Sequence, residues 1–273
     1  MNFTNPSIDV IKNKKLYIFD MDGTIYLGGQ PFDFAVRFIN NLRNSGRKVL
    51  FFTNNASHTD EFYLAKLNRL GFGATADEIM TSGDVTAEYL NRHRAGKSVY
   101  LVGVQELIDD YYKKGINLVD GDVEKADIVV TSFDTTLTYK KLDDACRLIR
   151  NGAEFLSTHP DFNCPTETGF IPDSGAITAF VTASTGKTPT YFGKPYKETI
   201  EMIGEATGFD RDEMCIFGDR LYTDIALGKK FGVTSVLVLS GETQPADVDA
   251  AAEADKPDFV FDCLDNVDKE MFV

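Results

Sequence analysis

Residues 16–24, which read LYIFDMDGT, constrain the fold more than any other segment. Four apolar residues run directly into Asp20 and Asp22, and Gly23 and Thr24 follow. An unbroken apolar run of this length is typical of a strand buried on both faces, as in a parallel sheet covered by helices. Asp20 and Asp22 would then follow the carboxyl end of a strand, where open α/β sheets bind their ligands. Because two carboxylates this close repel each other, the pair requires a cation or a shared proton.

Short apolar strands alternate with helical patterns in the first and last parts of the chain. The spacing of Phe34, Phe38 and Leu42 indicates a helix that Gly46 can close. The expected elements are strands over residues 16–19, 49–52, 214–217, 236–239 and 259–261, the last at a sheet edge, and helices over 33–44, 60–70, 224–230 and 246–254 and from about 197. This alternation predicts a parallel sheet with right-handed crossovers.

The middle of the chain holds enough further elements for a second α/β domain. We expect strands over residues 99–102, 128–130 and 154–157, and helices over 105–114, 138–150 and 175–185. A chain of 273 residues is also longer than most single domains. We therefore predict a doubly covered, Rossmann-like α/β core formed by residues 1–83 and 187–273, with residues 84–186 inserted as a second α/β domain.

The charge and composition of the chain limit its partners. It has 28 Lys and Arg against 42 Asp and Glu, a formal net charge of −14, whereas a nucleic-acid-binding surface would be basic. No apolar run is long enough to span a bilayer, and residues 1–15 lack the apolar core of a signal peptide. The four cysteines are widely spaced and form no CxxC pair. We expect a reduced, cytoplasmic protein that binds neither nucleic acid nor membrane.

Four groups of polar residues fall at strand ends or in turns, in the same order as the expected strands. A polar residue after a strand is usually only a turn residue or a helix cap, so each group by itself is a weak signal. Together they indicate one converging site. The groups are Asp20 with Asp22, Thr53 with Asn54 and Asn55, Lys194 in a Gly-Lys-Pro turn, and Asp219 with Asp224 five residues later.

This series of motifs resembles that of the haloacid dehalogenase-like (HAD) superfamily. DxDGT at residues 20–24, a strand-end threonine, a lysine and GDxxxxD at 218–224 are its four-part signature. TNNAS at 53–57, GKP at 193–195 and GDRL at 218–221 are similar to its NagD-like subclass IIA. That group includes p-nitrophenyl, nucleotide and pyridoxal phosphate phosphatases. The resemblance covers nearly the whole chain and implies a HAD core with a C2-type α/β cap, inserted between the second and third motifs.

The resemblance implies a phosphatase in which each motif has a role. Asp20 would attack phosphorus and form an aspartyl-phosphate, which divides one very slow hydrolysis into two easier steps. Asp22 would protonate the leaving oxygen and then deprotonate the attacking water. Thr53 would hold a phosphoryl oxygen, and Lys194 would offset the charge of Asp20 and the phosphoryl group.

The resemblance also implies a metal site. Asp20 and Asp219 would bind Mg²⁺ together with the backbone carbonyl of Asp22, and Asp224 would complete the metal site by orienting metal-bound water; an oxygen-only, water-retaining site suits this ion. A count of charges supports it, because four carboxylates and a phosphate dianion would otherwise face one lysine. At an effective dielectric near 20, one like-charge contact at about 4 Å costs roughly 4 kcal/mol. We expect no activity without a divalent cation.

Substrate contacts are implied at four further positions, namely Gly23, Asn54, Asn55 and His159. His159 lies in the segment STHPD at residues 157–161, which is similar to a cap loop that contacts the leaving group in this family. The expected partner is a small phosphate monoester, such as a p-nitrophenyl, nucleotide, sugar or pyridoxal phosphate. The sequence does not select among these. A homodimer formed through the cap is also compatible with the resemblance.

Other functions fit the motifs less well. A dehalogenase or phosphonatase does not use a second acidic residue as Asp22 would be used here. A phosphotransferase remains an alternative, because it would differ mainly in how the cap excludes water. A non-catalytic phosphate-binding module is the other alternative; it predicts loss of a motif residue, yet Asp20, Asp22, Lys194 and Asp219 are all present.

Overall fold

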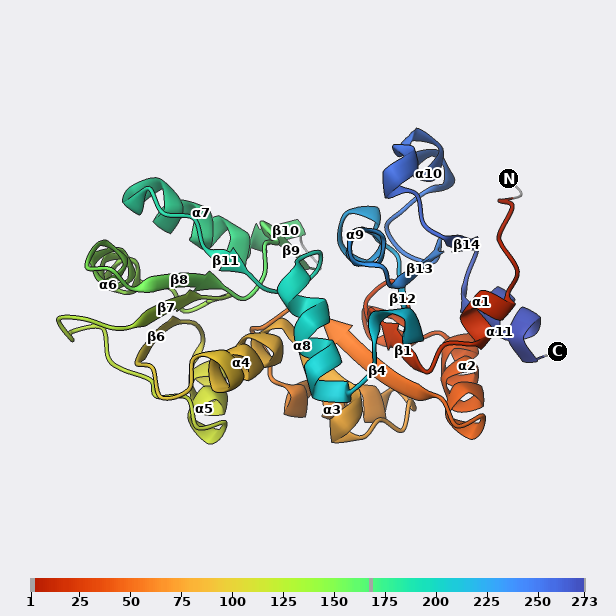
Figure 1. The fold of residues 1–273 in the computed structure, drawn as a ribbon, viewed down its shortest axis with the longest axis horizontal. Helices are drawn as coiled ribbons and strands as arrows, with labels where there is room; N and C mark the ends of the chain where they lie inside the picture. Colours follow the sequence, from red (N-terminus) through yellow and green to blue (C-terminus); the bar gives the residue numbers. More distant parts are fainter. Residues whose placement is uncertain (1–2, 167–168, 273) are drawn as a thin grey trace. The chain divides into compact units, whose positions relative to one another are not determined.

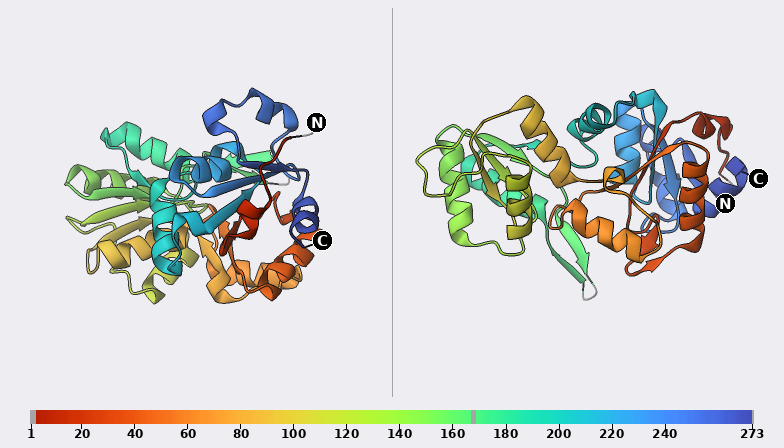
Figure 2. Two further views of the ribbon diagram at one scale, coloured as in Figure 1. Left: turned by 45° about the vertical axis from the view of Figure 1, so that its right-hand side comes forward. Right: turned by 90° about the horizontal axis from the view of Figure 1, so that it is seen from below.

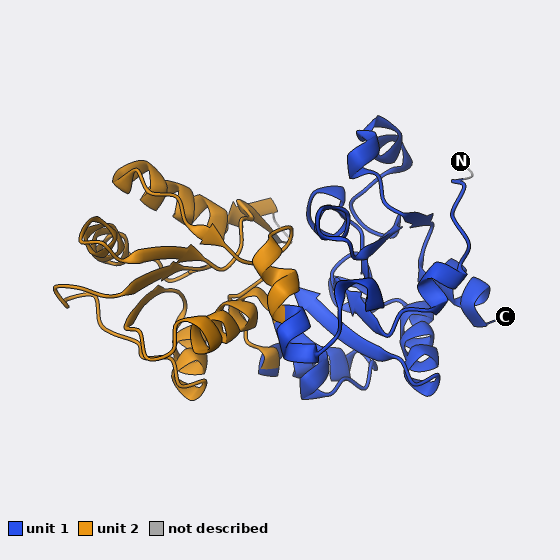
Figure 3. Cartoon of the chain, viewed as in Figure 1, with its two compact units in different colours: residues 1–53, 61–80, 203–273 blue, residues 54–60, 81–202 orange. Residues whose placement is uncertain are grey.

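The chain divides into two compact units. The computed structural model describes residues 3–166 and 169–272. Unit 1 comprises residues 1–53, 61–80 and 203–273, and unit 2 comprises residues 54–60 and 81–202 (Figure 3). The expected insertion, 84–186, lies wholly within unit 2. Residues 54–60, 81–83 and 187–202, which the sequence placed with the core, also belong to unit 2.

Unit 1 is built on a six-stranded sheet with the order β14-β13-β12-β1-β4-β5 (Figure 1). β1 pairs in parallel with β12 and with β4, and β13 pairs in parallel with β12 and β14. From β1 the chain fills one side of the sheet and returns to fill the other, so the strand order reverses between β1 and β12. Open α/β sheets bind ligands at such a reversal. The strands are β1 (Leu16–Phe19), β4 (Lys48–Thr53), β5 (Ile79–Thr81), β12 (Met214–Gly218), β13 (Thr234–Val238) and β14 (Phe259–Phe261).

Apolar side chains hold the central strands of unit 1 together. The rings of Phe19 on β1 and Phe217 on β12 stack with their centroids 4.8 Å apart. Phe38 of the covering helix α2 (Asp33–Asn44) meets both rings edge-on. α2 ends before Gly46, whose φ of 81° suits the left-handed turn that follows. The helices of this unit are α1 (Asp9–Lys12), α2 (Asp33–Asn44), α3 (Asp60–Arg69), α9 (Ala226–Phe231), α10 (Pro245–Ala250) and α11 (Leu264–Phe272), and a small hairpin pairs β2 (Tyr26–Leu27) with β3 (Gln30–Pro31).

Unit 2 has its own parallel sheet, in the order β11-β8-β7-β6. Its strands are β6 (Val99–Val102), β7 (Ile128–Thr131), β8 (Glu154–Ser157) and β11 (Thr190–Tyr191), and its helices are α4 (Ser82–His93), α5 (Gln105–Lys113), α6 (Tyr139–Arg150), α7 (Ser174–Thr185) and most of α8 (Lys197–Thr207). An antiparallel hairpin of β9 (Asn163–Thr166) and β10 (Gly169–Pro172) extends from this unit (Figure 2).

Most elements expected from the sequence are confirmed, including the edge position of β14. The helix expected over 224–230 is wrong in its start, because a π-helical turn over Leu221–Ile225 precedes α9. The helix expected over 246–254 ends early, at Ala250. The sequence did not predict α1, the β2–β3 hairpin, β5, α4, the β9–β10 hairpin or β11. Thr81 and Asp84 form a capping box at the start of α4, a local signal that could have predicted this helix.

Within the described residues, none of the helices is both long and apolar enough to cross a membrane. All four cysteines are free, and Cys215 is buried, as its apolar neighbours predicted.

Candidate metal and phosphate site

Two carboxylates of unit 1 come from neighbouring strand ends. Asp20 directly follows β1, and Asp219 directly follows β12. The parallel register, in which Phe19 faces Phe217, brings these two ends level with each other. The amide N–H of Asp20 donates to the carbonyl of Phe217 over 2.8 Å, which extends the strand pairing to the aspartate itself. The sheet therefore fixes the backbone of both residues.

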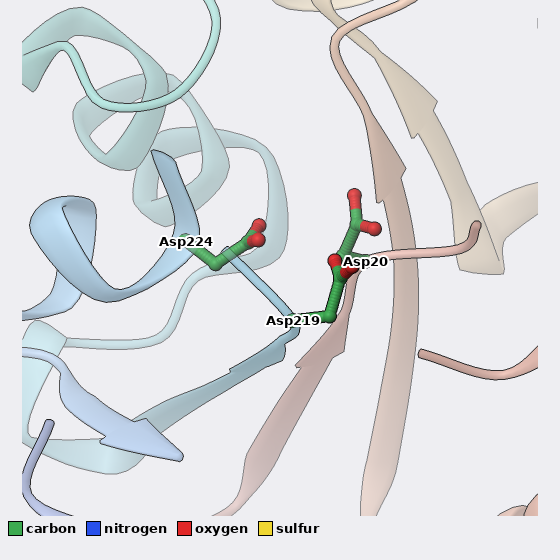
Figure 4. Close-up of side chains that lie close together, drawn as sticks. All are labelled: Asp20, Asp219 and Asp224. Carbon is green, nitrogen blue, oxygen red and sulfur yellow. The ribbon is translucent and has the colours of Figure 1, made fainter. Parts of the chain in front are cut away.

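Asp224 reaches the same place from the π-helical turn after β12. The wide turn folds Asp224 back against Gly218, where an added Cβ would lie 2.2 Å from the Asp224 Cβ. A glycine is thus required at 218 for the approach. Ligand oxygens of Asp20, Asp219 and Asp224 all lie within 4.8 Å of one another (Figure 4). Asp219 and Asp224 are 2% and 0% exposed.

A loop after β13 encloses Asp219. The Glu242 amide donates to Asp219 Oδ2 over 2.7 Å, and the Thr243 amide donates to the Asp219 carbonyl over 3.2 Å. Gly23 and Gly241 face the same carboxylate, and a Cβ on either would lie within 2.4 Å of Oδ2. These contacts fix the carboxylate in a closely fitting recess at the strand ends.

Gly23 has a packing role in addition to the phosphate contact expected of it, which stays a prediction. Its N–H donates to the Tyr26 carbonyl over 2.8 Å, and its carbonyl accepts from Ser240 Oγ over 2.7 Å. Its φ of 84° and its closeness to Asp219 both require a residue without a side chain. In this structure Gly23 makes room for Asp219.

Two cationic side chains of unit 1, those of Arg220 and Lys66, interact electrostatically with aspartates of the site. The sequence had assigned neither of them a role. Burial of Arg220 would lower its pKa, but Asp20, Tyr222, Asp219 and Glu242 together outweigh that effect and raise the pKa above its usual value. Arg220 also pairs with Glu242, Nε to Oε2 at 2.9 Å. Burial lowers the pKa of Lys66, and the charge of Asp22 opposes that change. The only sequence signal for Arg220 was its position in the GDRL motif, and no local pattern indicated a role for Lys66.

The remaining expected residues of unit 1 are Asp22 and Thr53. Asp22 is exposed, and its side chain lies outside the group of three carboxylates found among the described residues. That placement is compatible with the proton-transfer role expected of its side chain. Thr53 is the last residue of β4, the strand that pairs with β1 on the side opposite β12. Asp22 follows the carboxyl end of its strand, as expected, whereas Thr53 is the terminal residue of a strand that extends one residue further than expected.

The three clustered carboxylates fit a hard divalent cation. They offer only oxygen donors, and two of the three residues are almost fully buried. Mg²⁺ binds through a few carboxylates and retains waters, which matches such a partial donor set. Without a cation, three carboxylates this close would repel one another strongly.

The other expected site residues belong to unit 2. Lys194 is 2% exposed, and its backbone is bonded to the side chain of Asn54. Asn55 Oδ1 accepts from the amide and the hydroxyl of Ser57, so this side chain shapes a turn. His159 is fully buried, with Nε2 2.8 Å from Asp173 Oδ1. Asp173 was missed, because nothing in the sequence links it to a residue fourteen positions earlier.

Family models for haloacid dehalogenase-like hydrolases match residues 17–117 and, under the description HAD-like hydrolase, residues 191–267. An acid sugar phosphatase of Staphylococcus saprophyticus is 36% identical over 261 residues, 96% of this chain and 99% of that protein. The 4-nitrophenylphosphatase of Thermotoga maritima has a similar solved structure, with a TM-score of 0.90, 39% identity, and coverage of 96% of this chain and 99% of that one. A p-nitrophenyl phosphatase from Archaeoglobus fulgidus matches with a TM-score of 0.87 and 30% identity, over 94% and 99% of the two chains.

Proposed function

Since this chain belongs to the haloacid dehalogenase-like hydrolases and is a phosphatase, we propose that it hydrolyses small phosphate monoesters with Mg²⁺ through an aspartyl-phosphate on Asp20. The carrying observation is the cluster of Asp20, Asp219 and Asp224 at the strand reversal of unit 1. Relatives named for sugar phosphates and for p-nitrophenyl phosphate support small monoesters as the substrate class.

Asp20 and Asp22 would carry out the covalent steps. A carboxylate oxygen of Asp20 attacks phosphorus while the bond from phosphorus to the leaving oxygen breaks, and Asp22 gives that oxygen its proton. In the second step Asp22 takes a proton from water, the water oxygen bonds to phosphorus, and the bond from phosphorus to Asp20 breaks. The exposure of Asp22 supports this role, because its carboxyl must exchange a proton with substrate and water.

The other residues would hold charge in place. Asp20, Asp219, Asp224 and the Asp22 carbonyl would bind Mg²⁺, which would supply the positive charge that a phosphoryl group needs near these carboxylates. Thr53 would donate its hydroxyl to a phosphoryl oxygen. Lys194 would contribute a cation, which we expect to matter most when charge moves onto the leaving oxygen.

Replacement of the nucleophile tests the proposal. We expect Asp20→Asn to reduce turnover of p-nitrophenyl phosphate to below about 1% of wild type, because covalent catalysis contributes orders of magnitude. Wild-type protein quenched in acid during turnover of a ³²P-labelled monoester should retain label that hydroxylamine removes, and Asp20→Asn should retain none. Asp33→Asn, a change at the exposed first residue of α2, is the control and should behave as wild type.

Residual turnover above about 1%, with unchanged labelling in Asp20→Asn, would exclude Asp20 as the nucleophile. A separate measurement, phosphate release by the wild-type protein from a panel of sugar, nucleotide and pyridoxal phosphates, would rank these substrates.

A further inference from the structure

Asn54 clamps the backbone of Lys194 on both sides. Its Oδ1 accepts from the Lys194 N–H over 2.7 Å, and its Nδ2 donates to the Lys194 carbonyl over 2.9 Å. Both residues are almost fully buried within unit 2. A side-chain amide that bonds both the N–H and the C=O of one residue fixes the direction in which that residue's side chain leaves the chain. Asn54 therefore positions Lys194.

The residue before Lys194 leaves no free space against His159. Gly193 has a φ of 75°, and an added Cβ would lie 2.7 Å from the His159 Cβ and 2.9 Å from Asn54 Oδ1. His159 thus packs directly behind the turn that carries Lys194. His159 therefore lies directly against the turn and limits its movement on that side.

Ser82 connects His159 to Asn54 a second time. Its hydroxyl donates to the Asn54 carbonyl and lies 3.3 Å from His159 Nδ1. All three residues are buried. Buried polar groups of this kind are held in one arrangement, because any displacement leaves a donor or acceptor without a partner. A displacement of His159 would therefore disturb the Asn54 backbone through Ser82 and the Asn54 side chain through Gly193.

Asp173 fixes the ring of His159. Asp173 Oδ1 lies 2.8 Å from His159 Nε2 and also accepts from the Ser174 amide at the start of α7. Because a carboxylate only accepts, Nε2 carries the hydrogen of this bond. The other ring nitrogen, Nδ1, lies 3.0 Å from Thr158 Oγ1 as well as near Ser82. The imidazole is thus held at both of its nitrogens.

The order Ser82, His159, Asp173 resembles a nucleophilic triad, but the geometry excludes that role. Ser82 and His159 are both 0% exposed, so no substrate carbonyl or phosphorus can reach the hydroxyl. The Ser82 hydrogen is also committed to the Asn54 carbonyl. Both ring nitrogens of His159 lie within hydrogen-bond distance of protein groups, which argues against direct contact between His159 and the leaving group of a substrate.

We propose that the Asp173–His159 pair is a positioning device for Lys194, acting through Gly193, Ser82 and Asn54. The inference rests on the role of Lys194 in the proposed function and assigns His159 no contact with substrate. A misplaced lysine weakens an interaction that is strongest in the transition state, so kcat falls more than KM rises. Since every phosphate monoester presents the same phosphoryl group, the loss is similar for all of them.

His159→Ala and Asp173→Asn test the device. We expect each to lower kcat for p-nitrophenyl phosphate about 10- to 100-fold, as for a catalytic group displaced by about 1 Å, with a much smaller change in KM. His159→Gln should recover part of kcat, because its amide can still donate toward Asp173. Asp144→Asn is the matched control: Asp144 is a buried aspartate of the same unit that pairs with Lys140, and kcat should stay near wild type.

Hydrogen exchange provides a readout that does not depend on activity. The Lys194 amide is bonded to Asn54 Oδ1, so peptides covering residues 190–197 should exchange faster in His159→Ala and Asp173→Asn than in wild type. Asp144→Asn should leave exchange in these peptides unchanged. Folded variants with wild-type exchange and wild-type kcat would overturn the proposal, as would a changed ranking of substrates with an unchanged kcat for p-nitrophenyl phosphate.

Lys194→Ala separates this inference from the function beneath it. Full turnover by Lys194→Ala would contradict the role of Lys194 in the proposed function, while the exchange measurement would still decide whether His159 holds the turn. Loss of turnover in Lys194→Ala together with unchanged His159→Ala and Asp173→Asn would refute only the positioning device.

Discussion

Asp219 can reach its position beside Asp20 only because two glycines leave room for it. Gly23 and Gly241 lie on the faces of its carboxylate, and the Glu242 amide donates to Oδ2. The residues around a metal ligand often matter nearly as much as the ligand itself, because they set its direction. At the scale of single residues, the site depends as much on absent side chains as on charged ones.

Gly23→Ala tests this dependence. An added Cβ would lie 2.4 Å from Asp219 Oδ2, so we expect the Kd for Mg²⁺ to rise about 10- to 100-fold, measured by titration calorimetry. Gly28→Ala is the control, because Gly28 also has positive φ but has no atoms within 4 Å of the added Cβ. Equal effects of the two substitutions would mean that backbone strain, and not the recess around Asp219, accounts for the loss.

The far end of the same sheet is held by a hydrogen-bonded carboxylate. Asp258, just before β14, accepts from Lys229 Nζ of α9 and from both the amide and the hydroxyl of Ser235 on β13. Burial by itself would raise the pKa of Asp258, but the bonds from Lys229 and Ser235 together lower it below the usual 3.8. One side chain thus ties a helix and two strands together.

Asp258→Asn should show this contribution through its pH dependence. A lowered folded-state pKa means that the stabilisation is complete above the unfolded pKa and is lost as the pH falls through the folded value. We expect the variant to be about 1–2 kcal/mol less stable than wild type at pH 7, and the difference to shrink below about pH 4, in urea unfolding. Asp262→Asn, at an exposed position nearby, should show no such difference. If the difference in unfolding free energy between Asp258→Asn and wild type stays constant down to pH 3, the ionised carboxylate is not its source.

The molecule as a whole carries a net charge of −14, yet it is a phosphatase, and the substrates of phosphatases are anionic. A strongly negative chain must create positive potential locally if it is to hold such a substrate. The carboxylate cluster of unit 1 adds further negative charge at the site, and a bound divalent cation would supply the positive potential that the substrate requires. A cytoplasmic location and a homodimer through the cap remain predictions from the sequence.

Metal should therefore stabilise the folded chain as well as activate it. At a free Mg²⁺ concentration of about 100 times its Kd, linkage gives roughly 2.7 kcal/mol of stabilisation, and a Tm higher by several degrees. EDTA should abolish both this shift and turnover of p-nitrophenyl phosphate, and Asp219→Ala should show no shift. The same shift with NaCl at equal ionic strength, or in Asp219→Ala, would contradict binding at the cluster.

The sequence by itself determined the α/β class, the central strands of both sheets and the residues of the carboxylate cluster, but it did not predict β5 or β11. These features are encoded locally, since an apolar run of four residues followed by a carboxylate specifies both a buried strand and what stands at its end. The early start of helical structure before Asp224 escaped that reasoning, because a π-helical turn leaves no simple periodic signature.

Only the tertiary structure decided the surroundings of those residues. Asn54 meets Lys194 across 140 positions, and Ser82 meets His159 across 77. Such bonds form because packing of strands and helices brings remote backbone segments together, and no local pattern records them. The same is true of the recess that Gly23 and Gly241 leave for Asp219. The sequence thus identified the candidate catalytic and metal-binding residues, and the fold determined which neighbouring residues hold them in place.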